Sequence, residues 1–338
     1  MAERKPLTVS EPMSADTVPP ATRAIGIKPD LLPAVIVLSC AVLLIIATKA
    51  MNPNSGMLQQ INAVLVTSIF LVIGSFGQGL AILIGGIDLS IGVVIGLSAM
   101  MISVLTNGQD DALPWAVPAT LVSCTAIGVI NGGGIALGGI PPFIMTLASG
   151  ITFFGVGLGF TSGLAQEPVA PALQSLMSGH WLGVQIPVYL VVVFVILATL
   201  LQNGTSEGRK LYALGSSQGA AQVLGLPVAG LTILAYAVSG FCAGLSGLLL
   251  AGYSSAATLD MGNPLLLPTI AAVVIGGARV TGGKGLYLGT FAGALFLNAL
   301  ETVITVLSLS QGLRDIIEGA IIVIALLLQS EKWKALQR

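Results

Sequence analysis

The chain has 338 residues, of which 55% are hydrophobic and only 8% are charged. A soluble domain carries about a quarter charged residues, so this composition excludes a water-soluble protein and indicates a polytopic membrane protein. The formal net charge of −1 gives no indication of a nucleic-acid-binding surface. The three cysteines, Cys40, Cys124 and Cys242, lie in apolar stretches without paired spacing, which argues against a disulfide framework or a zinc site.

The first thirty residues are rich in Pro, Ser, Thr and charge and contain no apolar run. We therefore expect residues 1–30 to form a disordered cytosolic tail. The first apolar stretch begins at Leu31 and extends to about Thr48, which is long enough to cross the hydrocarbon core of a bilayer. Its distance from the start of the chain fits an uncleaved membrane anchor rather than a signal peptide.

Apolar runs recur along the rest of the chain and predict an all-α fold, a polytopic membrane helix bundle of about ten transmembrane helices. The runs are Leu31–Thr48, Ile61–Ile84, Leu89–Thr106, Pro114–Ile130, Phe143–Ser162, Pro187–Leu201, Ala229–Tyr253, Pro264–Gly277, Leu286–Leu307 and Leu313–Leu328. The eighth is short and contains Pro264 and Pro268, so it also fits a helix that begins inside the membrane. We expect the membrane domain to span residues 31–329 and residues 330–338 to form a short cytosolic tail.

Lys and Arg are distributed unevenly between the two sides of this predicted bundle. With the N-terminal tail inside, the inner side collects Arg4, Lys5, Arg23, Lys28, Arg209, Lys210, Arg279, Lys284, Lys332, Lys334 and Arg338. The outer side keeps only Lys49 and Arg314. Because cytosolic loops carry an excess of Lys and Arg, we expect both termini to be cytosolic.

Residues 203–228 form the longest polar interruption of the apolar sequence and divide it into two blocks of spans. The segment carries Glu207, Arg209 and Lys210, followed by a run of small residues from Ala213 to Gly225. The charge bias places it in the cytosol. We interpret this segment as a docking surface, because a chain with so little polar material needs a solvent-exposed face for it.

Glycine residues four positions apart occur in five of the predicted spans. The pairs are Gly92/Gly96, Gly128/Gly132, Gly155/Gly159, Gly240/Gly244 and Gly289/Gly293. Such pairs let helix backbones approach closely in a membrane. Packing within one chain is the favoured interpretation for any single pair, and a contact between two chains is the alternative.

The sequence GGIDLSIG between the second and third spans contains Gly85, Gly86, Asp88 and Ser90. The glycines permit a tight turn, and Asp88 suits the start of the third helix, where free N–H groups and the positive end of the helix dipole favour an acid. Acids at membrane depth also belong to transport pathways. We favour the structural cap over a transport role for Asp88.

Two prolines, Pro141 and Pro142, precede the fifth span and are expected to start its helix rather than bend it. Thr146 and Thr152 follow within that span. Their hydroxyls either face a polar path or bond back to their own helix, and the second arrangement is the commoner one.

The glycine-rich sequence from Gly276 to Gly285 contains Gly276, Gly277, Gly282 and Gly283 and one lysine, as a phosphate-binding loop would. The required GxxxxGK[ST] pattern is absent, because Lys284 is followed by Gly285. No strand is predicted before it. A tight turn with inside-positive charge explains the segment better than nucleotide binding does.

Glu301 lies inside the ninth span, where an acid has to be neutral, paired or hydrated. Asn298, Arg314 and Glu318 are candidate neighbours. A pathway-lining role and a structural contact are equally compatible with the sequence, and Thr146, Asn298 and Glu301 are the candidate pathway residues. So few intramembrane acids argue against an ion-coupled carrier. No catalytic Ser-His-acid set, paired carboxylates or metal-ligand cluster is visible, so we do not expect an enzyme.

Four stretches together resemble a known family. They are Gly85–Gly92 (GGIDLSIG), Pro142–Leu147 (PFIMTL), Gly208–Gly225 (GRKLYALGSSQGAAQVLG) and Gly276–Gly285 (GGARVTGGKG). In this order they resemble the permease subunits of ribose-type ABC importers, within the branched-chain amino acid and sugar permease superfamily. The resemblance covers nearly the whole chain from Leu31 onward.

The resemblance implies that residues 203–228 are the loop that couples the permease to its ATPase. Arg209, Ala213, Gly215, Ala220, Ala221 and Gly225 would belong to this coupling loop, with a short cytosolic helix seated in a groove of the ATPase. The sequence departs from the family at Ser217-Gln218-Gly219, where relatives commonly have Asn-Pro-Glu, and at Gln222, where an Arg is customary. Gly219 is expected to weaken the helix by up to about 1 kcal/mol relative to Ala.

The resemblance also implies the partners and the place of action. Substrate would arrive on a periplasmic sugar-binding protein, a second permease subunit would complete the pathway, and a cytosolic ABC ATPase would drive the cycle in the bacterial inner membrane. ATP and Mg²⁺ would bind that partner, and this chain would bind no cofactor. The cargo would be a small neutral sugar, a pentose or hexose, which the scarcity of charge in the spans also favours. A secondary carrier or facilitator acting alone and a non-transporting scaffold or receptor are the alternatives.

Overall fold

The computed structural model describes residues 31–51, 56–161 and 167–329. The two predicted tails, 1–30 and 330–338, lie outside these residues. The α-helices of the described chain are α1 (Leu32–Met51), α2 (Met57–Leu83), α3 (Ile91–Thr106), α4 (Leu113–Ala136), α5 (Pro142–Phe160), α6 (Pro171–Ser178), α7 (Ile186–Gly204), α8 (Ser206–Ser216), α9 (Gln218–Val223), α10 (Val228–Ser254), α11 (Leu266–Ile275), α12 (Tyr287–Val306) and α13 (Gln311–Gln329).

The remaining elements are short and join the helices at their ends. They are the 3₁₀ turns Asp110–Ala112 and Asn263–Leu265 and the strands β1 (Glu167–Pro168), β2 (His180–Trp181), β3 (Val184–Gln185) and β4 (Ala256–Ala257). β1 pairs antiparallel with β4, with Glu167 opposite Ala257, and β2 pairs antiparallel with β3, with His180 opposite Gln185.

Each predicted apolar run contains a helix, which confirms the all-α membrane bundle. Within the described residues, seven helical segments are long and apolar enough to cross a membrane, namely α1, α2, α4 with the 3₁₀ turn before it, α5, α7, α10 and α12. α3 and α11 are apolar but shorter. The shortness of α11, which follows a 3₁₀ turn, fits the prediction of a helix that begins inside the membrane. The total of ten spans stays a prediction.

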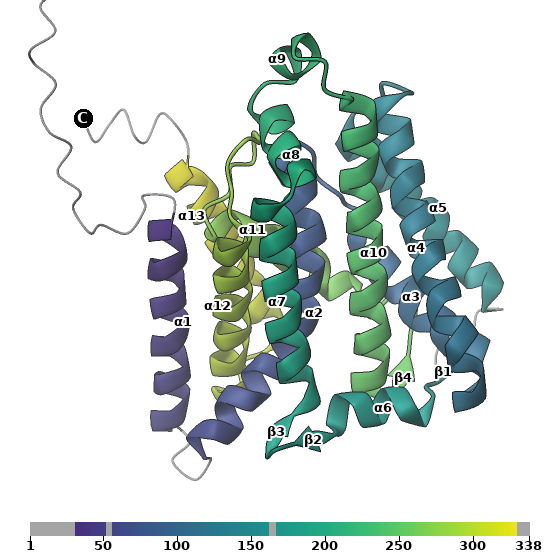
Figure 1. Cartoon of the computed structure of the whole chain (residues 1–338). Helices are drawn as coiled ribbons and strands as arrows, with labels where there is room; N and C mark the ends of the chain where they lie inside the picture. Colours follow the sequence, from purple (N-terminus) through teal and green to yellow (C-terminus); the bar gives the residue numbers. More distant parts are fainter. Residues whose placement is uncertain (1–30, 52–55, 162–166, 330–338) are drawn as a thin grey trace, which may run out of the picture.

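The helices stand side by side and leave two distinct ends (Figure 1). α8 and α9 lie at one end, which we call the α8–α9 end, and α6 with β2 and β3 lies at the opposite end. α2 and α10 occupy the centre, where α10 packs against α2, α3 and α4. α1 and α5 lie at the periphery with most of their residues uncovered by the chain. The core is therefore built around one helix from each block of spans.

Glycines set the spacing of the central helices. A Cβ added at Gly128 of α4 would lie 2.1 Å from the carbonyl oxygen of Tyr236, and one at Gly240 of α10 would lie 2.3 Å from that of Cys124. A Cβ at Gly132 would lie 2.6 Å from the Cα of Ile233. No side chain fits at these distances, so α4 and α10 touch through their backbones. The expectation of packing within one chain is confirmed for this crossing.

The pair on α5 behaves differently. An added Cβ at Gly155 or Gly159 would meet no described atom within 4 Å. The large apolar side chains of the same helix include Phe143, Ile144 and Ile151, all of which are exposed. α5 therefore presents a small-residue face and an apolar face that no described part of the chain covers.

Candidate coupling and transport site

Asp88 is buried at the junction of the α2–α3 turn with α10, with 2% of its surface exposed. Its Oδ1 accepts hydrogen bonds from the backbone N–H of Ser90 at 3.0 Å and from the Ser90 hydroxyl at 2.6 Å. Its Oδ2 accepts a hydrogen bond from the Ser239 hydroxyl at 2.7 Å. The predicted bond to a backbone N–H at the start of the third helix is present, and the carboxyl also links that turn to α10, 151 residues further along the chain.

Two more buried side chains extend this network. The amide nitrogen of Asn131 in α4 donates to the Ser90 hydroxyl at 2.9 Å, while its oxygen has no partner in the described chain. Thr146 of α5 accepts a hydrogen bond from the N–H of Leu89 at 3.0 Å, and its hydroxyl lies 3.2 Å from the carbonyl oxygen of Ile87. Buried polar groups of this kind hold a segment in one arrangement when they are bonded. The turn that carries Asp88 is thus fastened to α4, α5 and α10.

Thr146 is one of the predicted pathway residues, and in the structure its hydroxyl holds this turn against α5. It is fully buried, and its hydroxyl is within 2.9 Å of the carbonyl oxygen of Pro142 as well. Pro142 is the first residue of α5, as expected for a proline without an N–H to donate. Thr152 bonds back to the carbonyl of Ala148, the commoner of its two expected arrangements.

The GGIDLS turn, the polar segment and the glycine-rich loop meet at one point of the backbone, at the end of α2. The N–H of Gly283 donates to the carbonyl oxygen of Leu83 at 2.8 Å. A Cβ at Gly215 of α8 would lie 1.8 Å from the same oxygen. One at Gly282 would lie 2.9 Å from the nitrogen of Gly85 and 3.0 Å from the carbonyl oxygen of Gly215. We call this meeting point, formed by Leu83, Gly85, Gly215, Gly282 and Gly283, the glycine junction.

Positive φ angles explain why glycine occupies the turns of the junction. Gly85 has φ of 84°, Gly282 has 89° and Gly283 has 74°, all in the region that L side chains rarely adopt. Gly86 has another reason, because a Cβ there would lie 2.3 Å from the hydroxyl of Tyr236. The N–H of Arg279 bonds the carbonyl of Lys284 at 2.9 Å across the loop. The predicted tight turn is therefore confirmed.

The flanks of the glycine-rich loop are packed just as tightly. At Gly276 an added Cβ would lie 2.3 Å from the carbonyl carbon of Gly289 in α12. The neighbouring Gly277 has φ of 93°. The hydroxyl of Tyr212 in α8 donates to the carbonyl oxygen of Gly285. The loop is thus fixed to α8 by a side chain and to α12 by direct backbone contact.

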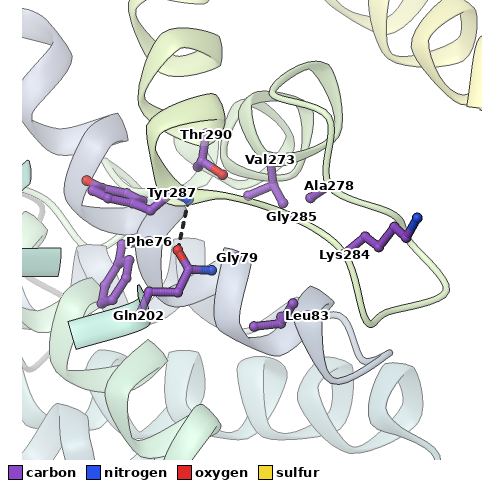
Figure 2. Close-up of a pocket in the computed structure, with 10 residues that line it drawn as sticks. All are labelled: Phe76, Gly79, Leu83, Gln202, Val273, Ala278, Lys284, Gly285, Tyr287 and Thr290. Atoms are coloured by element: carbon purple, nitrogen blue, oxygen red, sulfur yellow. Dashed lines mark hydrogen bonds between the residues drawn. The ribbon is translucent and has the colours of Figure 1, made fainter. Parts of the chain in front are cut away.

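α7 contributes a further contact to the start of α12, shown in Figure 2. Gln202 projects from α7, and its Oε1 accepts a hydrogen bond from the N–H of Tyr287 at 2.8 Å. Phe76 of α2 stacks edge-on against the ring of Tyr287, with centroids 4.8 Å apart. The space between these side chains is only about 10 Å³, and the side chain of Lys284 points away from it. This cluster is a packed support for the junction, with no room for a ligand.

α8 and α9 are two short helices with a break at Ser217. The Thr205 hydroxyl caps α8 by accepting from the N–H of Gly208 at 3.1 Å, and the Ser217 hydroxyl caps α9 by accepting from the N–H of Ala220 at 3.3 Å. Within α8, Lys210 forms an ion pair with Glu207 at 2.6 Å, and Arg209 is exposed. Where the resemblance implies one short helix, the structure therefore has two.

The small residues predicted for the coupling loop divide into two groups. Gly215 and Ala221 face the chain itself, with Ala221 only 1% exposed. Ala220 is exposed, Ala213 is half-buried, and Gly225 has φ of 72° in the turn that leads into α10. Close approach at Gly215 therefore serves contact with α2.

The tip of α9 carries two exposed apolar side chains. Val223 is 90% exposed and Leu224 is 74% exposed. We call these two residues the apolar tip. α9 lies at the α8–α9 end of the bundle (Figure 1), so the apolar tip lies there as well. Sequence reasoning emphasised the small residues and did not identify this tip.

The other candidate pathway residues lie elsewhere. Asn298 of α12 is 6% exposed and donates to the carbonyl of Ala294 at 3.1 Å in its own helix. Glu301 follows one turn later and is half-buried. Asp88 accepts hydrogen bonds from Ser90 and Ser239, and neither Asn298 nor Glu301 is among these partners. Among the described residues, no group of three or more His, Cys, Asp or Glu could hold a metal ion.

Ser239 and Asn131 are members of the Asp88 network that sequence reasoning missed. Both are completely buried; Ser239 lies inside an apolar run and Asn131 directly follows one. Their position in the sequence is the only signal that they matter, since a polar group within a membrane span needs a partner. Their partner lies in another helix, and no local pattern reveals which one.

Comparisons with known proteins give the family. The family model described as the branched-chain amino acid transport system permease component matches residues 60–326. The chain is 32% identical to the ribose import permease RbsC of Bacillus subtilis strain 168, over 86% of this chain and 90% of that protein. It is 31% identical to RbsC of Escherichia coli K12, over 86% and 92%.

A relative with another named cargo is equally similar. The autoinducer 2 import permease LsrD of Yersinia enterocolitica is 30% identical, over 85% of this chain and 89% of that protein. No solved structure matches the chain. The matched region contains the Asp88 network, the glycine junction and the apolar tip. The chain therefore belongs to the permease-component family of branched-chain amino acid transport systems, and it is a multi-pass membrane permease subunit of an ABC importer, not an enzyme.

Proposed function

We propose that this chain forms the membrane pathway of an ATP-driven importer for a small neutral sugar of the pentose or hexose class. The observation that carries the proposal is the family match over residues 60–326, together with relatives named for ribose and autoinducer 2 import. The scarcity of charge in the membrane helices supports an uncharged, hydroxyl-rich cargo, since a charged solute would need compensating charges along its path.

The cytosolic ABC ATPase docks on the apolar tip. Val223 and Leu224 are exposed at the end of α9, a short helix capped by Ser217. α9 follows directly on α8, which contacts the glycine junction through Gly215. Exposed apolar side chains of this size suit a groove on a partner protein. ATP and Mg²⁺ bind the ATPase, and this chain receives the resulting movement.

The glycine junction carries that movement to the α2–α3 turn. Gly215 touches Leu83 without an intervening side chain, and the turn that begins two residues later carries Asp88. In a direct backbone contact the two segments cannot move far independently, because no flexible side chain lies between them. A displacement of α8 therefore displaces the end of α2 and the turn together.

The α8–α9 end faces the cytosol in this proposal, as do both termini. Arg209, Lys210, Arg279 and Lys284 all lie in the segments that form this end of the chain, and the outer loops keep few basic residues. A periplasmic sugar-binding protein then delivers the cargo at the opposite end, in the inner membrane of a bacterium.

A second permease subunit pairs with this one through α5. The uncovered glycines Gly155 and Gly159 and the exposed apolar residues around them support this, because helix pairs in membranes associate through small residues. The α4–α10 glycines already contact each other within the chain. Among the described spans, α5 is thus the one whose glycine pair remains available to a partner, an identical or a related chain.

The function is tested by uptake in a strain that lacks this chain, using radiolabelled pentoses, hexoses and sugar alcohols. We expect loss of uptake of at least one neutral carbohydrate and its recovery when the chain is restored together with its ATPase and binding protein. Uptake by the chain alone, driven by an ion gradient, would identify a secondary carrier instead. Uptake unchanged for every sugar would contradict the proposal.

A further inference from the structure

A cavity of about 350 Å³ opens beside the Asp88 turn, at the α8–α9 side of the bundle. Its walls come from the α2–α3 turn, the end of α4, the start of α5, the first turns of α10, and α8 and α9. The residues used below are Gly86, Ala136, Leu214, Gln218, Thr232 and Tyr236. Ligand pockets in proteins measure about 300–1,000 Å³, so this cavity has room for a small molecule.

The hydroxyl of Tyr236 is the feature that points to a ligand. Tyr236 has no exposed surface, yet its hydroxyl has no hydrogen-bond partner in the described chain. Tyr236 and Gly86 both line the cavity, and the missing side chain at Gly86 leaves room for the hydroxyl itself, because a Cβ there would lie 2.3 Å from it. Buried tyrosine hydroxyls normally have a partner. This hydroxyl has none among the described residues, and it belongs to a residue that lines the cavity.

The chemistry of the walls selects the kind of ligand. None of the residues that line the cavity is Asp, Glu, Lys or Arg, so a charged molecule would enter without compensation. The hydroxyl of Thr232 donates to the carbonyl of Val228 at 3.0 Å and keeps its lone pairs for a second partner. The amide of Gln218 adds donors and an acceptor at the cavity wall. Apolar walls with a few neutral polar groups suit a hydroxyl-bearing, uncharged solute.

We propose that this cavity holds the cargo on the inner side of the transport path, with the Tyr236 hydroxyl hydrogen-bonded to a hydroxyl of the sugar. The inference rests on the proposed function and adds a binding site for it within a single chain. Leu214 of α8 and Gln218 of α9 form part of the wall, so the element on which the ATPase docks also shapes the cavity. Movement of α8 and α9 therefore changes the shape of the site.

The test is the variant Tyr236→Phe, which removes the hydroxyl and keeps the ring. The matched control is Tyr253→Phe on the same helix, whose side chain is 48% exposed at the opposite end and does not line the cavity. Both are compared with wild type in proteoliposomes that contain the complete importer, with D-ribose as the first probe and the other sugars of the uptake screen after it.

Loss of one neutral hydrogen bond corresponds to an affinity decrease of about threefold to tenfold. We expect Tyr236→Phe to lower the uptake rate at limiting sugar by that factor without lowering the melting temperature, and Tyr253→Phe to change neither. If the wild-type importer takes up no neutral sugar, both the proposed function and this inference are wrong. Uptake by Tyr236→Phe equal to wild type would show that the hydroxyl meets only water, and a lower melting temperature would show a structural role; either result overturns this inference alone.

A second variant tests the cavity without the tyrosine. Ala136→Phe places a ring in the cavity from the end of α4. We expect a protein that melts at the wild-type temperature and takes up sugar at least ten times more slowly. If this variant takes up sugar at the wild-type rate, the cavity is not a binding site on the transport path.

Discussion

Gly215 of α8 touches the carbonyl oxygen of Leu83 at the end of α2 so closely that an added Cβ would lie 1.8 Å from it. The added Cβ would also lie 2.7 Å from the nitrogen of Gly283, so neither neighbour leaves room for a side chain at Gly215. All three groups belong to the backbone, which moves less readily than the end of a flexible side chain. The position is therefore the most direct test of how α8 communicates with the membrane helices.

Gly215→Ala is expected to separate α8 from α2. Because the methyl group cannot fit, the contact has to open, and we expect a melting temperature several degrees below wild type and loss of ATP-driven uptake. The matched control is Gly219→Ala in α9, where an added Cβ meets no described atom within 4 Å. Ala favours a helix over Gly by up to about 1 kcal/mol, so the control should be at least as stable as wild type. Equal melting temperatures for both variants would contradict the packing at Gly215.

Val223→Asp is expected to abolish ATPase docking while leaving the permease folded. The side chain is 90% exposed, so its replacement costs no core packing, whereas a carboxylate in an apolar groove is strongly unfavourable. The measurement is co-purification of the ATPase with a tagged permease, followed by uptake. Leu182→Ser, at a residue 82% exposed in the β2–β3 hairpin, is the control and should retain the ATPase. Retention of the ATPase by both variants would show that docking does not use the apolar tip.

Ser239→Ala removes the hydroxyl that donates to Asp88 Oδ2. A buried acceptor left without its donor costs about 1–3 kcal/mol, so we expect a lower melting temperature in detergent. Ser254→Ala on the same helix removes an exposed hydroxyl that bonds its own helix and should have little effect. If Ser239→Ala melts with the control, the link between Asp88 and α10 does not stabilise the bundle.

The orientation is tested with one cysteine introduced at Lys210 or at Leu182, in a background that lacks the exposed Cys40 and keeps the buried Cys124 and Cys242. A membrane-impermeant thiol reagent should label Leu182→Cys in intact spheroplasts and Lys210→Cys only in inverted vesicles. The two residues lie at opposite ends of the bundle, so each serves as the control for the other. Labelling of Lys210→Cys from outside would place α8 and α9 beyond the reach of any cytosolic ATPase and would exclude the importer.

Gly155→Trp is expected to weaken pairing of the permease. A large side chain at this uncovered position does not disturb the chain itself, because no described atom lies within 4 Å of an added Cβ. Gly319→Trp on α13 is the control, since it is equally open and lies on the other side of the molecule (Figure 1). The mass of the detergent-solubilised complex by light scattering measures the result. A dimer that persists in Gly155→Trp would show that α5 is not the interface.

Much of the fold could be predicted because membrane helices have a strong local signal. A run of apolar residues has to form a helix in lipid, since every backbone N–H and C=O must bond within the segment. The start of α5 at Pro142 and the tight turn around Gly282 have equally local causes. Pro264, Pro268 and the length of the eighth run likewise indicate a short helix, as α11 is.

The glycine junction could not be predicted in the same way. Gly85, Gly215 and Gly283 are each compatible with an ordinary turn or helix, and only their meeting explains why no side chain is allowed. That contact depends on how three distant segments pack, and no spacing in the sequence encodes it. The same holds for Asp88, whose cap at the start of the third helix is a local feature, while its bond to Ser239 spans 151 residues.

The apolar tip also affects the life of the chain before assembly. In the proposed assembly, a newly made permease exposes Val223 and Leu224 to water until its ATPase binds. Such a patch invites self-association and recognition by chaperones and proteases. We expect an overproduced permease to aggregate or to be degraded unless its ATPase is produced in matching amounts. The supply of the ATPase subunit would then limit how many complete importers a cell maintains.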